Sequence, residues 1–460
     1  MEQKKQLLAL AAQRGVSPGL LAFAVLSGPI SVLAQTKTAA APSLAANSAQ
    51  TVNGPLEGST TPSGVHLFKG GPFAPPPVLH RLRRHEPQPV QNWITVRSVQ
   101  EFGPRLMQQP LFGDMDFRSK GVSEDYFYLN VWTATKSAKE HRPVLVYFYG
   151  GAVARRGIVP ITVNYRLGVF GFLAHPELSR KSPHQVSGNY GFLDQSAALR
   201  WVQQNIAALG GHPKLVTIAG ESAGAMSVSA QMALPLSKNL FARAIGESGS
   251  MLNTSFGHAP LAQVGQAGLA FATSLGAASL AALRALPAQQ LLEAAGEPGT
   301  PRFAPTLDQY FFTAASAATF AAGQQAWVPL LVGWNSQEMS FQALLGFVVP
   351  TPESYRAAVQ KLYGERAGAV LKLYPADTAA EAEQSAADLA GDRFIAYSTW
   401  KWAGVQSSSQ PVYRFKSRAR PTMTPEMGNA TAGLAGGLVK QTPSAPKAPP
   451  ARGAVHSAEI

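Results

Sequence analysis

Residues 215–232 read LVTIAGESAGAMSVSAQM and decide how this chain folds. The first five residues are typical of a buried strand, the next five carry the pattern G-x-S-x-G, and the remainder favours a helix. In this context Ser222 is predicted on a strained turn with its Oγ exposed. Gly220 and Gly224 allow strand and helix to pass closely because neither carries a Cβ. The Ala223 amide, at the start of the helix, is expected to point at an oxyanion.

The segments before this stretch alternate between strand and helix patterns. Residues 144–149 (VLVYFY) and 158–165 are apolar runs that fit strands buried on both faces. They are followed by apolar residues at helical spacing: Leu193, Ala197, Ala198, Trp201, Val202, Ile206 and Leu209. Strand, helix and strand in this order predict an α/β fold with a mostly parallel central sheet flanked by helices. Small antiparallel strands are expected between residues 51 and 122, and helices beside the sheet or capping it over residues 261–295.

A near-copy of the central pattern occurs further along, where residues 246–250 read GESGS after another candidate strand. It is either a second elbow or a strand-end loop that lines the same site. Because the final glycine of the pattern is missing, we favour the loop.

Composition excludes several classes of protein. The chain has 460 residues and no cysteine, so thiol catalysis, cysteine-bound metals and disulfides are ruled out. Lys and Arg number 39 against 26 Asp and Glu, which gives a formal net charge of +13. The one dense basic cluster, predicted to be a solvated loop, comprises Arg81, Arg83 and Arg84 with His80 and His85. Aromatic residues are not interleaved with it, so we predict no nucleic-acid binding.

The N-terminus predicts export. Lys4 and Lys5 precede an apolar run at residues 20–26, and a small-residue cleavage site ends at Ala34. We therefore predict a signal peptide at residues 1–34, a disordered lead-in at 35–50 and one catalytic domain at 51–460. The protein would be secreted or periplasmic, or cytoplasmic if the segment is not cleaved. No unbroken apolar run reaches the roughly 18 residues that a membrane span needs. Residues 440–452 are predicted to be a loop or a mobile segment.

Several further motifs occur in a family-specific order. They read SEDYFYLNV at 123–131, YGG at 149–151, NYRLGVFGF at 164–172 and GNYGFLDQ at 188–195. With the G-x-S-x-G stretch, they make the chain resemble the type B carboxylesterases, the group that includes the cholinesterases, from about Thr51 to the last residue. The resemblance implies an α/β-hydrolase fold and hydrolysis of small-molecule esters through an acyl-enzyme, without metal or organic cofactor.

The resemblance also implies the partners of Ser222. In the family the triad acid is a glutamate in a short loop after a strand, and residues 328–338 (VPLLVGWNSQE) match that form at Glu338. Residues 453–460 (GAVHSAEI) resemble the histidine loop, so His456 is the expected base. The eight other histidines precede Ser222 or Glu338, whereas the fold requires the order serine, acid, histidine. Amides of Gly150 and Gly151 are expected to complete the oxyanion hole with Ala223.

Two features depart from the family pattern. After the glycine pair the family has a longer segment, whereas here only residues 151–157 join two predicted strands, and a parallel crossover usually takes about ten to twelve residues or more. Either a strand is shortened or displaced, or the two strands are antiparallel. Pro160 adds to the doubt because proline is unusual in a central strand. The family also continues beyond the histidine loop, so we expect a catalytic domain shortened at its C-terminal end.

Three interpretations remain open from the sequence. The first is an exported carboxylesterase. The second is a non-catalytic or weakly active α/β-hydrolase-fold protein that binds a partner, which the altered oxyanion loop favours. The third is a product that does not fold stably. Acyl group, alcohol group, stereopreference and oligomeric state are not determined by the sequence.

Overall fold

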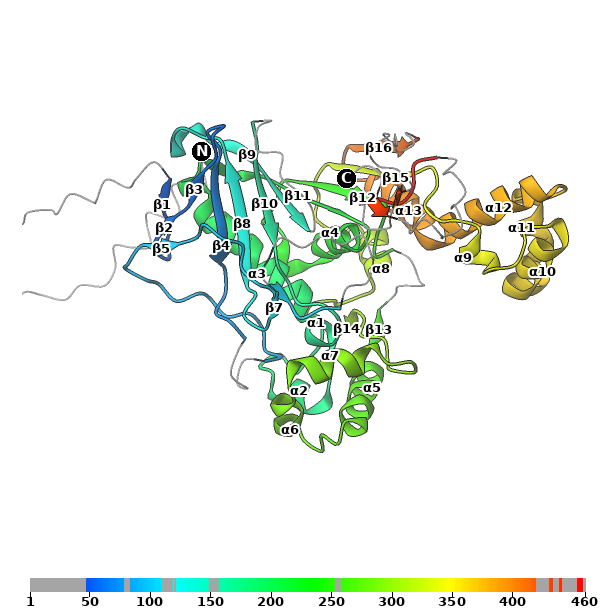
Figure 1. Cartoon of the computed structure of the whole chain (residues 1–460), viewed down its shortest axis with the longest axis horizontal. Coiled ribbons are helices and arrows are strands. Elements are labelled where there is room, and N and C mark those ends of the chain that lie inside the picture. The colour runs from blue at the N-terminus through cyan, green and yellow to red at the C-terminus, as the bar shows by residue number, and fades with distance from the viewer. Residues whose placement is uncertain are drawn as a thin grey trace, which may run out of the picture. The chain divides into compact units, whose positions relative to one another are not determined.

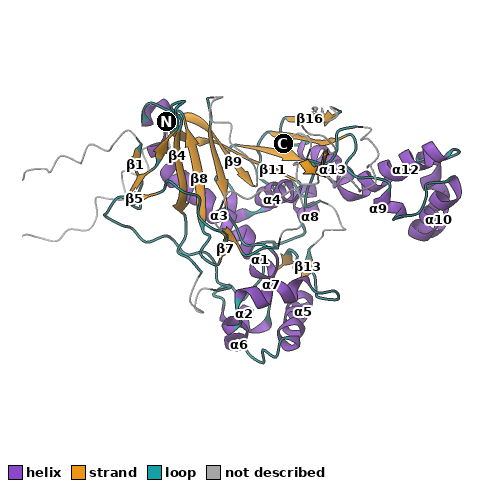
Figure 2. Ribbon diagram, in the orientation of Figure 1, coloured by secondary structure: helices purple, strands orange, loops and turns teal. Residues whose placement is uncertain are grey.

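A mixed sheet of nine strands forms the centre of the described chain (Figure 1 and Figure 2). The order is β16-β15-β12-β11-β9-β10-β8-β4-β3, in which the strands from β16 to β10 are parallel and β8, β4 and β3 are antiparallel to their neighbours. The bounds are β3 Ser59–Thr60, β4 His66–Pro72, β8 Tyr128–Thr133, β9 Arg142–Phe148, β10 Val159–Val163, β11 Gly211–Glu221, β12 Arg243–Glu247, β15 Leu330–Asn335 and β16 Val412–Ser417. The predicted α/β class is confirmed.

The computed structural model describes residues 47–77, 83–109, 119, 121–148, 157–252, 258–418, 430–432, 438–440 and 453–457. These residues belong to one compact unit that spans residues 44–460. Strand β1 occupies Ser48–Gln50 and pairs with β2 at Pro55–Glu57, so ordered structure begins before residue 51, inside the predicted lead-in. The predicted signal peptide and residues 441–452 lie outside the described residues, and the predictions for them stay predictions.

The remaining strands are short. They are β5 Arg97–Ser98, β6 Arg105–Leu106, β7 Val122–Ser123, β13 Ala259–Pro260, β14 Thr306–Leu307, β17 Ala430–Ala432 and β18 Leu438–Lys440. Strand β5 pairs with β2, and β6 pairs with β7, in both cases in parallel. The N-terminal strands are therefore small, as predicted, but not all antiparallel.

The predicted helices are present. The bounds are α1 Gly168–Phe172, α2 Pro176–Lys181, α3 Tyr190–Asn205, α4 Ala223–Ala233, α5 Leu261–Ser274, α6 Leu280–Ala285, α7 Ala288–Gly296, α8 Ser316–Ala321, α9 Gln342–Leu345, α10 Pro352–Tyr363, α11 Ala367–Leu373, α12 Ala379–Gly391 and α13 Tyr397–Gln406. Helix α3 carries the predicted apolar spacing, and its last positions continue as a 3₁₀ turn at Ile206–Leu209. Alternate residues of β9, Val144, Val146 and Phe148, are fully buried in the main core.

Two groups of helices form lobes with apolar clusters of their own. Helices α5, α6 and α7 enclose one cluster with α1 and α2, which lies below the sheet in Figure 1. Helices α9 to α12 form the second. Residues 261–295 are therefore helical, as predicted. No helix in the described ranges is long and apolar enough to cross a bilayer.

The doubtful crossover between β9 and β10 joins parallel strands. Val159 pairs with Val144 and Thr162 with Tyr147 in parallel register, so the antiparallel alternative is wrong. The other alternative is confirmed, because β10 begins at Val159 and β9 ends at Phe148, which leaves residues 149–158 for the connection. Pro160 precedes the pairing of β10 with β8, which begins at Ile161, so its missing N–H costs no bond on that side.

The predicted solvated basic loop is wrong for two of its members. Arg83 is 9% exposed and Arg84 only 2%. Arg83 forms an ion pair with Glu124 and donates to the backbone carbonyls of Arg284 and Leu286, at 2.6 Å each. Long-range partners that the local sequence does not reveal thus draw this segment into the protein. His80 and Arg81 lie outside the described residues.

A buried ion pair joins the segment that follows β10 to α3. Arg166, three residues after β10, donates from its backbone amide and Nε to Asp194 Oδ2, at 3.0 and 2.8 Å, and from Nη2 to Oδ1 at 2.6 Å. The two side chains are 2% and 0% exposed. Such a pair is strongly destabilising when one partner alone is removed, since a charge is left buried without compensation.

We predict that Asp194→Asn lowers the free energy of unfolding by about 3–5 kcal/mol. The measurement is urea denaturation followed by circular dichroism. The control is Asp377→Asn, because Asp377 pairs with Arg356 on the surface and its side chain is 84% exposed. That change is expected to cost less than about 1 kcal/mol. Equal losses in the two variants would contradict the assigned role of the buried pair.

A partly buried histidine makes stability depend on pH. His258 packs edge-on against Phe312, with ring centroids 4.1 Å apart, and burial lowers the pKa of its imidazole from 6.5 to about 4. The unfolded chain therefore takes up this proton first, and stability is lost as the pH falls from 6.5 towards 4. We expect the loss from this group to reach about 3 kcal/mol.

The test compares urea midpoints of wild type and His258→Gln across that pH range. Other titrating groups contribute equally to both proteins, so the variant should lose less stability on acidification. Parallel pH profiles would show that His258 is not held neutral in the folded state.

Candidate active site

The turn between β11 and α4 places Ser222 in a conformation that few residues adopt. Its φ is 54° and its ψ −117°, which is the strained elbow predicted from the sequence. Its amide donates to the carbonyl of Glu247, at the end of β12, over 2.8 Å. The turn is therefore fixed by the neighbouring parallel strand as well as by its own sequence.

Three glycines make this turn sterically possible. A Cβ on Gly220 would lie 2.4 Å from the carbonyl carbon of Gly224, and one on Gly224 would lie 2.3 Å from the carbonyl oxygen of Phe148. The predicted close passage of strand and helix is confirmed. A Cβ on Gly249 would lie 2.5 Å from the carbonyl oxygen of Ser222, a restriction that the sequence analysis did not predict.

Three predicted residues, from distant parts of the chain, meet at this turn. Ser222 Oγ lies 3.0 Å from His456 Nε2, and His456 Nδ1 lies 2.6 Å from Glu338 Oε2. Glu338 and His456 are buried, with 3% and 5% exposure, whereas Ser222 is partly exposed. The serine is thus open to a reactant while the two groups behind it are shielded from water.

The Glu338 carboxylate is fixed by further donors. Its Oε1 accepts from the Asn335 amide at 2.6 Å and from Ser248 Oγ at 2.7 Å. Ser248 directly follows β12 and belongs to the GESGS sequence, whose first two residues end that strand. The prediction that this near-copy is a strand-end loop lining the same site is confirmed. With both oxygens engaged, the carboxylate has little freedom to turn away from His456.

The segment that carries His456 is attached to the loop after β15. Gln337 donates its amide to the Ala454 carbonyl at 2.8 Å and forms a parallel bridge with Val455. In return, the Ala454 amide donates to Ser336 Oγ at 3.0 Å. The loop that presents Glu338 therefore also positions the segment that carries His456.

A second carboxylate, which the sequence analysis missed, also reaches the histidine. Glu221 Oε1 lies 3.1 Å from His456 Nε2 and accepts from Ser457 Oγ at 2.8 Å. Both residues adjoin a predicted site residue in the sequence, Ser222 and His456 respectively. Adjacency on a sharp turn is the one signal that could have indicated them.

The predicted oxyanion donors are described only in part. Ala223 is the first residue of α4, where backbone amides lack partners within the helix. Gly150 and Gly151 lie outside the described residues. Phe148, the last described residue before them, has its carbonyl oxygen beside Gly224, so the chain leaves β9 next to the elbow.

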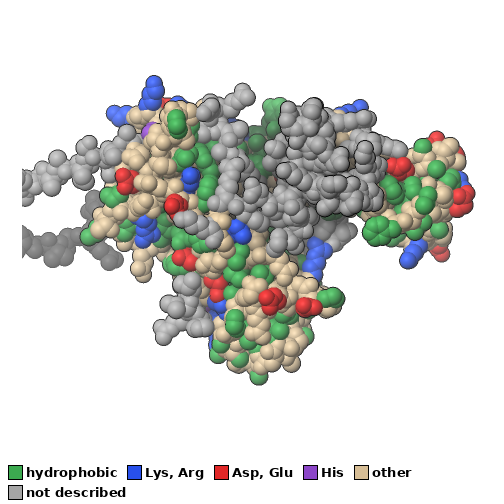
Figure 3. All heavy atoms as spheres, viewed as in Figure 1, with side chains coloured by type: hydrophobic (Ala, Val, Ile, Leu, Met, Phe, Trp, Pro, Cys, Tyr) green, Lys and Arg blue, Asp and Glu red, His purple; other side chains and the backbone are tan. Residues whose placement is uncertain are grey.

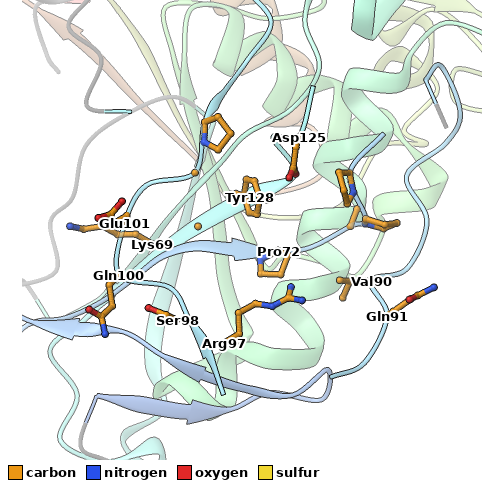
Figure 4. A pocket seen from close by; sticks show the side chains of 16 residues that line it. Lys69, Pro72, Val90, Gln91, Arg97, Ser98, Gln100, Glu101, Asp125 and Tyr128 are labelled. Carbon is orange, nitrogen blue, oxygen red and sulfur yellow. The ribbon is translucent and has the colours of Figure 1, made fainter. Parts of the chain in front are cut away.

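Outside this constellation the described surface offers other hollows. One of about 700 Å³ is bordered by side chains such as Lys69, Arg97, Glu101 and Asp125 (Figure 4), and it includes none of the predicted site residues. In the described ranges no cluster of three or more His, Asp or Glu side chains is arranged to hold a metal ion. On the face seen in Figure 3, the described Lys and Arg side chains are dispersed.

Comparisons with known proteins bear on this site. A family model described as the carboxylesterase family matches residues 45–460. Fumonisin B1 esterase of Sphingopyxis macrogoltabida is 36% identical over 407 residues, which cover 83% of this chain and 72% of that protein. Carboxylesterase 1D of Mus musculus is 35% identical over 361 residues, or 70% and 61%. Para-nitrobenzyl esterase of Bacillus subtilis (strain 168) is 32% identical over 394 residues, or 80% and 77%. The chain thus spans about three fifths of the mouse protein.

The short contact between Glu338 and His456 gives a spectroscopic prediction. A proton held between Nδ1 and a carboxylate at this separation is strongly deshielded, so we expect a far-downfield proton resonance in the NMR spectrum. It should vanish in Glu338→Ala and persist in Ser222→Ala, which leaves the Nδ1 bond intact. A resonance that persists in Glu338→Ala would contradict the geometry described above.

Proposed function

Because the chain belongs to the carboxylesterase family, we propose that it hydrolyses carboxylic esters through an acyl-enzyme on Ser222, with His456 as base and Glu338 as the acid that orients it. The family resemblance and the α/β-hydrolase fold predicted from the sequence are confirmed. The roles of the three residues are the proposal.

One observation carries this proposal. The hydrogen-bonded series Glu338, His456, Ser222 links a buried carboxylate to a partly exposed hydroxyl through one imidazole, with contacts of 2.6 and 3.0 Å. A carboxylate on Nδ1 keeps the proton there and leaves the Nε2 lone pair free to accept the serine proton. This arrangement activates a hydroxyl that is otherwise a weak nucleophile.

The chemistry runs in two balanced halves. As Ser222 Oγ forms a bond to the ester carbonyl carbon, its proton passes to His456 Nε2 and the carbonyl oxygen becomes an oxyanion. The oxyanion collapses, the bond to the alkoxy oxygen breaks, and Nε2 returns its proton to the leaving alcohol. Water then attacks the acyl-enzyme by the same steps and releases the acid, which regenerates Ser222.

Two features of the structure support stabilisation of the charges that develop. Ala223 follows the nucleophile and is the first residue of α4. Its backbone amide is therefore in the place where a donor to the oxyanion is needed. Gly150 and Gly151 are proposed as the further donors on the sequence pattern alone. Beside the histidine, the Glu221 carboxylate at 3.1 Å favours the imidazolium that forms during attack.

The proposed substrates are small-molecule carboxylic esters. Two of the relatives are named fumonisin B1 esterase and para-nitrobenzyl esterase. The two names state different esters. The substrate class shared by these names is the carboxylic ester, and the proposal for this chain goes no further.

The test of the proposed nucleophile is intact-mass analysis after exposure to a fluorophosphonate probe. We expect one adduct on the wild-type chain and none on Ser222→Ala, because the probe reacts with activated serines. His456→Ala and Glu338→Ala should slow the reaction by about 10²- to 10⁴-fold. Ser407→Ala serves as the control, since Ser407 is exposed and its hydroxyl donates to the backbone carbonyl of Gly404 at 2.8 Å, with no contact to the triad in the described residues.

A folded sample that forms no adduct would overturn the proposed activity and favour the alternative of a binding protein on the same fold. A cooperative thermal transition recorded on the same sample separates that result from failure to fold.

A further inference from the structure

The residue that follows the proposed base has a strained backbone. Ser457 is buried and has a φ of 64°, in the left-handed region that serine rarely adopts. Glycine adopts this conformation without strain because it has no Cβ. A strained residue persists where the surrounding structure or the function of the site requires it. Because the hydroxyl group is what serine has and glycine lacks, its contacts indicate what the strain supports.

The hydroxyl of Ser457 binds a carboxylate beside the triad. Its Oγ donates to Glu221 Oε1 at 2.8 Å, and the same carboxylate oxygen lies 3.1 Å from His456 Nε2. Glu221 is the last residue of β11, and its side chain is largely shielded from solvent. One carboxylate oxygen is thus in contact with both the serine hydroxyl and the ring nitrogen that faces the nucleophile.

The contact between Glu221 and Nε2 favours one charge state of the imidazole. When Nδ1 donates to Glu338, the neutral ring has a lone pair on Nε2, and a carboxylate oxygen at 3.1 Å repels that lone pair. In the imidazolium the same nitrogen carries a proton, so the contact becomes an ion pair. Glu221 therefore favours the charged ring, and the Glu338 carboxylate on the other nitrogen acts in the same direction.

The other elements that adjoin the ring place no described charge in contact with it. Phe394, from the π-helical segment Asp392–Ala396, packs edge-on against His456, with ring centroids 5.5 Å apart. The charged side chains on these elements have partners of their own, which are Tyr374 for Asp392, the ring of Tyr363 for Arg393, and Tyr147 for Glu247. Within the described residues, the two carboxylates are the charged groups that contact the imidazole.

We propose that Ser457 is a positioning residue whose hydroxyl holds the Glu221 carboxylate against His456 Nε2 and thereby favours the charged form of the base. Without this donor the carboxylate is free to turn away from the ring. The inference rests on the proposed function, because it concerns the base of that reaction. Its consequence is that the imidazolium formed during attack is stabilised, while the neutral ring that accepts the serine proton is reached only at higher pH.

The experiment is an NMR titration of the His456 imidazole in wild type and in Ser457→Gly. Glycine suits a φ of 64°, so the variant should fold and be at least as stable as wild type. We expect the titration midpoint to fall by about 0.5–1 pH unit, which is about a 3- to 10-fold rise in the acid dissociation constant. The resonance is identified by its loss in His456→Gln, and the measurement needs no turnover.

Two further variants separate the hydroxyl from the backbone and from the charge. Asn239→Gly also places glycine at a left-handed position, with φ at 69°, but on the surface, and it should leave the midpoint unchanged. Glu221→Gln keeps the size of the side chain and removes its charge, so we expect a fall of about 1–3 pH units. In that background Ser457→Gly should add no further shift, because the serine acts through the carboxylate.

The pH dependence of labelling by the fluorophosphonate probe gives a second measurement. In Ser457→Gly the acid limb of the labelling rate should move to lower pH by the same amount as the titration midpoint. Above that limb the rate should be lower than in wild type, because the imidazolium loses part of its stabilisation. A merely structural defect would instead lower the rate by the same factor at every pH.

A midpoint that stays unchanged in Ser457→Gly, or that rises, would overturn the inference. A rise would mean that the hydroxyl weakens the carboxylate instead of holding it. A further shift in the Glu221→Gln background would contradict action through the carboxylate. Wild-type protein that forms no adduct would overturn the proposed ester hydrolysis instead, and the NMR titration would still decide whether Ser457 holds Glu221 on the imidazole.

Discussion

The steric restriction at the end of β11 is the constraint on which the rest of the site depends. Gly220, Gly224 and Gly249 bring the strand, the helix and the neighbouring loop so close that a Cβ on any of them would meet backbone atoms at 2.3–2.5 Å. Only this approach lets Ser222 hold its left-handed conformation while its amide bonds to the end of β12. The parallel sheet around it therefore acts as a rigid support, and the cost of the strained turn is met by packing elsewhere.

The other two residues reach the elbow because one loop holds both. The loop after β15 presents Glu338. In the same loop, Ser336 Oγ accepts a hydrogen bond from the backbone amide of Ala454. The histidine segment lies 118 residues beyond Glu338 in the chain, so its position is a tertiary property that no local pattern encodes. Ser248 adds a bond from a third segment. These hydrogen bonds restrict rotation of the Glu338 carboxylate, so the acceptor for the imidazole N–H is preorganised.

Much of the fold could be predicted because it rests on local patterns. Apolar runs, helical spacing and the G-x-S-x-G turn are short-range features, and the strands, α3 and α4 occur where these features predict them. The choice of Glu338 and His456 needed the family resemblance, since a single loop carboxylate or terminal histidine has no distinctive local signal. Pairing partners were not predictable. The pairing of β10 with β8 begins only after Pro160, and this register depends on a segment that is distant in the chain. The burial of Arg84 likewise depends on distant segments.

Three carboxylates of the described chain are buried, and they show how a protein poor in acids uses them. Asp194 accepts three bonds from Arg166, Asp308 accepts three backbone amides and the amide of Asn189, and Glu338 accepts from Asn335, Ser248 and His456. Of these partners only the imidazole exchanges a proton readily near neutral pH. Two carboxylates are thus committed to holding structure, while the third is coupled to a group that changes charge.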